Sequence, residues 1–205
     1  MPILYDAPNP APNPRRVRIF LAEKSLTVPI KELSIIKGEH KAPEFTVKYP
    51  QGQLPVLELD DGRVIGESVA ICRYFEALHP ETPLFGTDAL SIAEIDMWIR
   101  RVEFTLMNPI GQIWMHTHPF TARVVVPQYT EFGESNRPKA LAAMKRMDEA
   151  LQGRAFLAGD AYSVADIILL TTIDFAAFIG VVMPGDLSAL RGWHERVSAR
   201  PSAAA

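Results

Sequence analysis

Polar side chains at two places in the first half of the chain combine into one predicted notch. The first place is Gln53-Leu54-Pro55, where the proline enters a short apolar run that is typical of a strand. Proline cannot donate to a sheet ladder, and a cis bond before Pro55 would expose the amide of Leu54 beyond the strand end. The second place is Glu67-Ser68, which follows a return strand and opens a helix. The sequence therefore predicts a free backbone edge beside a carboxylate, a hydroxyl and unpaired helix N–H groups.

The elements around this notch follow the order strand, helix, strand, helix, strand, strand, helix. A stiff, proline-rich segment at residues 7–14 separates the first strand from the first helix. Asn13-Pro14 is a typical helix start, with asparagine as the N-cap and proline as the first helical residue. The predicted strands are 2–6, 28–33, 56–59 and 63–65, and the predicted helices begin near residues 13, 43 and 68. This order indicates an α/β, thioredoxin-like first domain (βαβαββα) over residues 1–80.

Beyond a short linker the strand signals disappear, and residues 87–205 predict an all-helical second domain of about five helices. Apolar residues recur at helical spacing from Ala89 to about Met115, with a kink expected at Asn108-Pro109. A capping box of Ser163 and Asp166 opens an apolar helix. The other helices are expected over 124–132, 138–151 and 187–199.

Composition and charge exclude several classes of protein. The chain has 205 residues and a formal net charge of −3, so no electrostatic feature favours nucleic acid as a partner. The longest apolar run, residues 167–182, is interrupted by polar residues and predicts a buried helix rather than a membrane span. The first residues lack the basic flank and apolar core of a signal peptide. A single cysteine, Cys72, excludes an intrachain disulfide and indicates a reducing cytoplasm.

The two halves of the notch resemble a known binding core. Gln53-Leu54-Pro55-Val56-Leu57, followed by Glu67-Ser68-Val69-Ala70-Ile71, is similar to the glutathione-binding core of the cytosolic glutathione S-transferases, bacterial members in particular. The resemblance implies that glutathione is the co-substrate, that a hydrophobic electrophile is the second substrate, that no metal takes part, and that the protein is a cytoplasmic homodimer. It also implies that the strand at Leu54 and Pro55 pairs with the cysteinyl backbone of glutathione. Glu67 and Ser68 would take the γ-glutamyl ammonium and carboxylate.

Three further residues extend the resemblance to the glycine end of glutathione. His40-Lys41 is similar to a basic pair of theta-class transferases that takes the glycine carboxylate, although a solvated loop would have the same residues. Gln53 is a candidate for the same carboxylate or for the cysteinyl amide. On the long helix, Glu103 resembles an acidic residue that reaches glutathione bound in the partner subunit.

The thiol of glutathione must be held as a thiolate, and here the chain departs from the family. Ala11 stands where many members have a serine, threonine or cysteine. A helix N-terminus also lowers a thiol pKa, and the side-chain amide at this helix start is Asn13. Its oxygen is expected to cap the helix by accepting from the N–H of Arg16, and its nitrogen to donate to the sulfur, as in the nu-class enzymes that it resembles. The alternative is that Asn13 is only a cap. Arg15 and Arg16 could add positive potential near the thiolate, but the expectation is that they are solvated.

Other reactive side chains have plainer interpretations. Tyr5 is expected in the core and Cys72 as a small buried side chain. Two residues apart on a helix, His116 and His118 would point about 200° from each other, which argues against a metal site. Burial in the core, or a place in the lining of an electrophile pocket, is expected for Met107, Trp114, Met115 and Phe120.

Three functions are compatible with these residues. The first is conjugation of activated glutathione to small apolar electrophiles. The second is glutathione-dependent reduction of disulfides or peroxides, which the combination of Ala11 and Asn13 favours. The third is a non-catalytic glutathione-binding scaffold, which Ala11 favours and the intact notch opposes.

Overall fold

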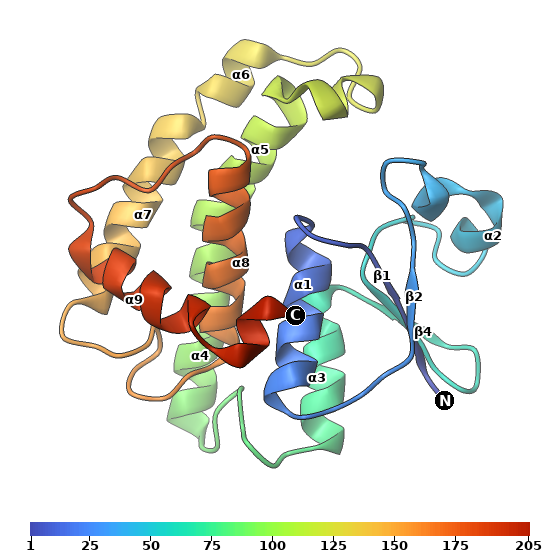
Figure 1. Ribbon diagram of the computed structural model, residues 1–205, viewed down its shortest axis with the longest axis horizontal. Coiled ribbons are helices and arrows are strands. Elements are labelled where there is room, and N and C mark those ends of the chain that lie inside the picture. The colour runs from blue at the N-terminus through green and yellow to red at the C-terminus, as the bar shows by residue number, and fades with distance from the viewer. The chain divides into compact units, whose positions relative to one another are not determined.

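The computed structural model describes residues 1–205, and it divides into two compact units. Unit 1 consists of Met1–Leu84 together with Arg200–Ala205, and unit 2 consists of Phe85–Ala199. Unit 1 combines a sheet with helices, whereas unit 2 contains helices and no sheet (Figure 1). The fold class predicted from the sequence is therefore confirmed.

Four strands form the sheet of unit 1, in the order β2-β1-β3-β4. They are β1 (Ile3–Asp6), β2 (Ile30–Glu32), β3 (Val56–Glu58) and β4 (Val64–Gly66). β1 runs parallel to β2 because a helix crosses between them, and β3 runs antiparallel to both of its neighbours. Leu4 and Leu57 face each other across the two central strands and are fully buried. The apolar runs of the sequence thus form the middle of the sheet.

Three helices flank this sheet: α1 (Pro12–Glu23), α2 (Pro43–Thr46) and α3 (Ser68–Leu78). α1 and α3 pack side by side (Figure 1). α2 contributes Phe45, whose ring packs with Tyr5 of β1 and with Val56 of β3. A short 3₁₀ turn, Glu39–Lys41, leads into α2. These helices position the turn before β3 and the start of α3, where the predicted notch lies.

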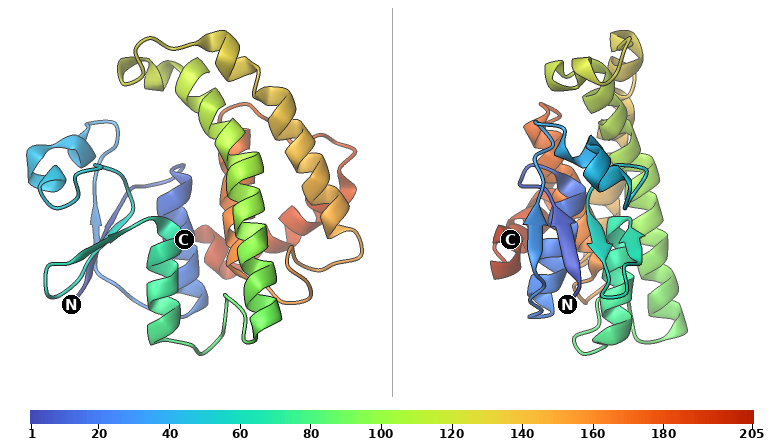
Figure 2. Two further views of the ribbon diagram at one scale, coloured as in Figure 1. Left: turned by 180° about the vertical axis from the view of Figure 1, so that it is seen from behind. Right: turned by 90° about the vertical axis from the view of Figure 1, so that its right-hand side faces the viewer.

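The C-terminal segment of unit 1, Arg200–Ala205, packs along α1 (Figure 2). Arg200 donates from Nε and Nη2 to the two carboxylate oxygens of Glu23, at 2.8 and 2.6 Å. The Ser202 hydroxyl donates to the same carboxylate, and Arg15 Nη2 donates to the carbonyl of Ala203 at 2.8 Å. The expectation that Arg15 is merely solvated was therefore wrong. The positive guanidinium of Arg200 and these hydrogen bonds outweigh partial burial and lower the pKa of Glu23.

Unit 2 contains six α-helices (Figure 2). They are α4 (Ala89–Arg101), α5 (Asn108–Thr117), α6 (Thr130–Glu134), α7 (Arg137–Leu151), α8 (Val164–Phe178) and α9 (Ser188–Ser198). The long pattern from Ala89 onward changes to a π-helical stretch at Val102–Met107, just before the expected kink at Pro109. None of the helices combines the length and apolar character needed to cross a bilayer.

One predicted helix of unit 2 was wrong. Residues 124–132 were expected to be helical, but the structure has a 3₁₀ turn at Pro119–Arg123 and then α6, which starts at Thr130. Pro127 lies in the middle of the expected helix, where it would remove a backbone donor and clash with the preceding turn. The three valines before it are also poor helix formers.

The capping box at the start of α8 is confirmed, and its aspartate does more than cap. Asp166 is fully buried and accepts from the backbone N–H of Ser163 at 3.0 Å and from its hydroxyl at 3.1 Å. It also accepts from the Leu157 N–H and from Trp193 Nε1, both at 2.9 Å. Burial raises the pKa of Asp166, although these donors oppose the rise. Asp166 thereby ties α8 to a loop and to α9.

Candidate functional site

Eight of the nine residues that the sequence suggested for glutathione line a single pocket of unit 1. The ninth, Glu103, lies in the π-helical stretch of unit 2. The pocket has a volume of about 540 Å³. Eleven residues line it: Asn13, Ile35, His40, Lys41, Tyr49, Gly52, Gln53, Leu54, Pro55, Glu67 and Ser68. Ile35, Tyr49 and Gly52 were not suggested by the sequence.

The backbone edge expected at Leu54 is present in the structure. The Leu54–Pro55 bond is cis, and Pro55 leads directly into β3. Neither the N–H nor the C=O of Leu54 has a hydrogen-bond partner in the chain. The neighbouring Gln53 side chain is exposed and unbonded. An extended ligand could therefore form strand-like hydrogen bonds with Leu54, because both of its backbone groups are open.

Glu67 and Ser68 form the opposite side of the pocket, where β4 passes into α3. Glu67 has the unusual backbone angles φ 65° and ψ 118°, and its exposed carboxylate has no partner in the chain. Such a conformation costs a non-glycine residue about 1–3 kcal/mol and is found most often at functional sites. Ser68 is 5% exposed, and its Oγ accepts from Arg16 Nη1 at 3.5 Å. Because its oxygen is the acceptor in that bond, the Ser68 hydroxyl hydrogen can donate to a ligand.

Arg16 was expected to be solvated, and the structure contradicts this. Its side chain is 3% exposed and lies beside Ser68. It also lies close enough to the buried thiol of Cys72 for its charge to act there. A buried guanidinium needs polar partners, and the pairing with Ser68 places a positive charge directly behind the pocket wall.

His40 and Lys41 lie on the 3₁₀ turn Glu39–Lys41. Gly52 lets this turn lie close to the segment that leads into β3. Gly52 has φ +55°, and a Cβ there would lie 2.7 Å from the His40 carbonyl oxygen. Lys41 Nζ donates to the carbonyl of Gln51 at 2.9 Å, which leaves two of its three hydrogens free. The Nδ1 atom of His40 is buried and has no partner. Burial, followed by the charge of Lys41, lowers the pKa of His40, so the imidazole is neutral at pH 7.

Asn13 lines the pocket, but it is not the N-cap that the sequence predicted. α1 begins at Pro12, and its N-cap is Ala11, with no side-chain capping bond. Proline is well suited to the first helical position because its φ is fixed and its missing N–H would be unpaired there in any case. Pro12 and Pro14 have no N–H, so Asn13 carries the single free backbone donor of the first three helical residues. Its side-chain amide also has no partner in the chain.

Tyr49 is a pocket residue that the sequence analysis missed. Its ring packs against the cluster of Tyr5, Phe45 and Val56. A Cβ on Gly66 would lie 2.1 Å from the Tyr49 hydroxyl oxygen, so the phenol lies against the backbone of β4 just before Glu67. Burial, and then the negative charge of Glu67, raise the pKa of Tyr49. Tyr49 belongs to no short motif, and only the structure brings it to the pocket.

Tyr5 and Cys72 take no part in the pocket. The Tyr5 side chain is 5% exposed, and its hydroxyl donates to Glu58 Oε2 at 2.7 Å. The Cys72 thiol is buried in α3, and burial raises its pKa far above the ordinary value. Both residues therefore have the structural roles that the sequence predicted.

The two histidines of α5 and the following turn are occupied by backbone donors. His118 Nδ1 accepts from the N–H of Phe120, and His116 Nδ1 accepts from the N–H of Tyr129, both at 3.2 Å. In the whole chain, no group of three or more His, Cys, Asp or Glu side chains converges as a metal site would require. These two hydrogen bonds instead stabilise the backbone of the segment that follows α5.

Aromatic side chains gather around Trp114 in unit 2. The ring of Trp114 lies 4.3 Å from that of His118, 5.7 Å from that of Phe120 and 5.4 Å from that of Phe175, centroid to centroid. Met115 and Phe120 are 40% and 41% exposed. Of the two interpretations that the sequence left open for these two residues, burial in the core is therefore excluded.

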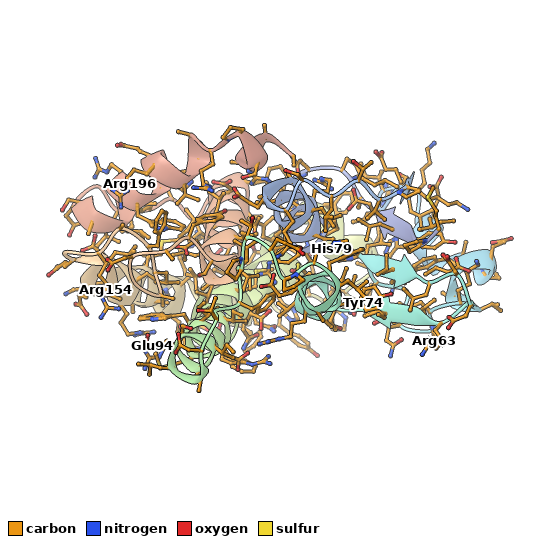
Figure 3. All side chains as sticks on the ribbon, turned by 90° about the horizontal axis from the view of Figure 1, so that it is seen from below. Arg63, Tyr74, His79, Glu94, Arg154 and Arg196 are labelled. Atoms are coloured by element: carbon orange, nitrogen blue, oxygen red, sulfur yellow. The ribbon has the colours of Figure 1, made fainter.

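A second pocket in unit 1 shares no residue with the first. Its volume is about 420 Å³, and Arg63, Tyr74 and His79 are among its lining residues (Figure 3). Arg63 donates from Nε to Asp61 at 2.7 Å, so its charge is already paired. Asp60 is likewise paired, with the N-terminal ammonium group at 2.9 Å, so the first pocket remains the candidate site.

The chain was compared with protein families and with known proteins. Residues 11–78 match the glutathione S-transferase N-terminal domain, and residues 113–201 match the glutathione S-transferase C-terminal domain. Glutathione S-transferase 2 of Saccharomyces cerevisiae is 40% identical over 203 residues, which cover 98% of this chain and 87% of that protein.

Two crystal structures give the same result. Gtt2 from Saccharomyces cerevisiae superimposes with a TM-score of 0.92 at 40% identity, covering 98% of this chain and 97% of that one. A glutathione S-transferase domain-containing protein from Marinobacter aquaeolei VT8 superimposes with a TM-score of 0.92 at 37% identity, covering 98% of each chain. The chain therefore belongs to the glutathione S-transferase family and is a glutathione transferase.

Proposed function

We propose that the pocket of unit 1 binds glutathione and that the enzyme conjugates its sulfur to small apolar electrophiles. The observation that carries this proposal is the convergence of eight sequence-selected residues on one pocket. These residues come from four separate stretches of the chain, so their meeting does not follow from sequence proximity. The polar groups of the pocket also match those of the tripeptide one by one.

The γ-glutamyl end of glutathione belongs beside the start of α3. Its ammonium group pairs with the exposed Glu67 carboxylate, which has no partner in the chain. Its carboxylate accepts from the Ser68 hydroxyl and from the free N–H groups of the first turn, with the positive charge of Arg16 behind them. The cysteinyl backbone pairs with the open N–H and C=O of Leu54.

The glycine end of glutathione extends toward the 3₁₀ turn. Lys41 has two free ammonium hydrogens, and Gln53 has an unbonded amide, so both can donate to the glycine carboxylate. The unpaired Nδ1 of His40 supplies a third polar atom at the same end.

The reacting sulfur lies at the start of α1. There the backbone N–H and side-chain amide of Asn13 donate to the thiolate and lower its pKa. The thiolate donates an electron pair to the electrophilic carbon, and a C–S bond forms. The leaving group departs with its bonding pair or, in an addition, the electrophile takes up a proton.

Calorimetry tests the binding proposal directly. Glu67→Ala should weaken glutathione binding by about 1.5 kcal/mol or more, because the ammonium group of the ligand would lose a charged hydrogen-bond partner. Glu44→Ala is the matched control, since Glu44 is an exposed glutamate of unit 1 outside the pocket. If Glu67→Ala binds glutathione as tightly as the wild type does, the proposed site is wrong.

Two other activities would use the same pocket. Ala11 offers no hydroxyl to the sulfur, which favours either glutathione-dependent reduction of disulfides and peroxides or a scaffold that binds glutathione without turnover. Assays with aryl halides, isothiocyanates, hydroperoxides and mixed disulfides separate these functions. Turnover of the first two substrate classes supports conjugation, turnover of only the last two supports reduction, and binding without any turnover supports the scaffold.

We also propose that the enzyme is a cytoplasmic homodimer. Leu90, Met97 and Phe104 follow each other at seven-residue intervals along α4 and the π-helical stretch, and they are 68%, 38% and 67% exposed. A row of exposed apolar side chains is typical of a helix that packs on another protein surface. The single buried cysteine, Cys72, suits a reducing compartment. Light scattering should give twice the chain mass of 22.8 kDa, and a monomer would refute the dimer.

A further inference from the structure

The Tyr49 phenol is a polar group of the pocket that glutathione recognition, as described above, does not use. Tyr49 lines the pocket together with Glu67 and Ser68. Its hydroxyl forms no hydrogen bond within the chain. The hydroxyl oxygen also lies against Gly66, 2.1 Å from the position that a Cβ on that residue would take. A phenol hydroxyl therefore lies beside the backbone that leads into Glu67.

This phenol is held rigidly. Its ring packs on Tyr5, Phe45 and Val56. Its backbone N–H donates to the carbonyl of Phe45 at 3.0 Å, and its carbonyl accepts from the N–H of Gly52 at 2.9 Å. Gly66 leaves no side chain that could push the hydroxyl away. Both ends of Tyr49 are thus fixed, and the position of the hydroxyl follows from the fold.

Glu67, by contrast, has a fixed backbone and a free side chain. Its φ of 65° sets the direction in which the side chain leaves the chain. Its carboxylate is exposed and unbonded, so several rotamers are open to it. Binding an ammonium group would require ordering this side chain, which costs rotamer entropy. A donor already held in place near the carboxylate would reduce that cost.

We propose that Tyr49 is a positioning residue for γ-glutamyl recognition, whose hydroxyl donates a hydrogen bond to the Glu67 carboxylate when glutathione binds. This inference rests on the proposed glutathione site. The bond holds the carboxylate toward the ammonium group of the ligand, so Tyr49 acts through Glu67. Because the pKa of Tyr49 is raised, the hydroxyl keeps its proton throughout the neutral range and remains a donor.

The test is Tyr49→Phe, which removes one oxygen and keeps the ring in its cluster. Calorimetry should show about tenfold weaker binding of glutathione, the change that corresponds to about 1.4 kcal/mol. Glutaryl-cysteinylglycine has the same skeleton without the ammonium group, and its affinity should be unchanged. Tyr74→Phe is the matched control, because it removes a phenol hydroxyl from the second pocket. Unchanged melting temperatures exclude a folding effect.

A double-mutant cycle identifies the partner of the hydroxyl. In a Glu67→Gln background, Tyr49→Phe should cause little further loss of glutathione affinity, because the charged acceptor is already absent. Equal losses in both backgrounds, or equal losses for both ligands, would show that the hydroxyl touches the ligand itself and would overturn the inference. The inference would also be overturned if Tyr49→Phe bound glutathione with wild-type affinity while Glu67→Gln bound it more weakly. If Glu67→Gln has no effect either, the proposed glutathione site itself fails.

Discussion

The proposed role of Asn13 is to activate the thiol of glutathione, and substituting this residue tests that role. A cysteine thiol ordinarily has a pKa of about 8.5. Prolines at two of the first three positions of α1 leave the backbone N–H of Asn13 as the free donor there, with its side-chain amide beside it. A hydrogen bond to a charged acceptor is worth about 1.5–3 kcal/mol, which corresponds to about one to two pKa units. Asn13→Ala should therefore raise the pKa of bound glutathione by that amount.

The structure makes this experiment cleaner than the sequence suggested. As an N-cap, Asn13 would have contributed about 1 kcal/mol to helix stability. The cap is Ala11 instead, and no side-chain capping bond exists. Asn13→Ala should therefore leave the melting temperature unchanged, so that a change in thiol pKa reports on the sulfur alone.

Asn13→Asp is the sharper probe. A carboxylate in the first turn of α1 interacts favourably with the helix dipole, so the fold should be preserved. The same carboxylate repels a thiolate and has no hydrogen to donate, so the thiol pKa should rise further than in Asn13→Ala. Conversely, the hydroxyl introduced by Ala11→Ser should lower it. Thiolate absorbance of bound glutathione against pH measures all three variants. If Asn13→Asp leaves the pKa where it was, the side chain does not contact the sulfur and the backbone alone activates it.

Two further changes test the ends of the ligand and the core of unit 2. Lys41→Ala should weaken glutathione binding by up to about fivefold, the range of an exposed ion pair. The affinity for γ-glutamylcysteine, measured by calorimetry, should not change, because that ligand lacks the glycine carboxylate. Equal losses of affinity for both ligands would place Lys41 elsewhere. Asp166→Asn should lower the free energy of unfolding, measured in urea, by about 3 kcal/mol or more, because an amide nitrogen would face buried donors. The affinity for glutathione should stay unchanged. A loss of stability below about 1 kcal/mol would mean that the donors find other partners.

The parts of the fold that the sequence predicted depend on local chemistry. Pro55 can stand only at the entry or the edge of a strand, and Ser163 with Asp166 forms a capping box within four residues. The buried apolar runs of β1 and β3 and a helix crossover then define the order of unit 1. Leu54, Pro55, Glu67 and Ser68 were found in the same way, because they lie where β3 and α3 begin. His40, Lys41 and the role of Asn13 came instead from the resemblance to the transferase family.

The parts that the sequence did not predict depend on contacts between distant residues. Arg16 is buried beside Ser68, which lies 52 residues later. Tyr49 reaches the pocket because Gly66 leaves room for its hydroxyl. The start of α1 was misplaced because Pro12 and Pro14 both suit a first turn, and the capping preference of asparagine decided wrongly between them.

The return of the chain to α1 limits how this protein can be divided. Glu23 receives its partners from Arg200 and Ser202, and Arg15 from Ala203, so unit 1 is assembled from both ends of the sequence. A fragment cut at the linker would lack these partners, and the partly buried Glu23 carboxylate would lose Arg200 and Ser202 at the end of the helix that carries Asn13. Recombination at that linker would likewise join an incomplete glutathione-binding unit to a foreign helical one. The linker is a boundary in the sequence, but unit 1 is complete only with Arg200–Ala205 from the other end of the chain.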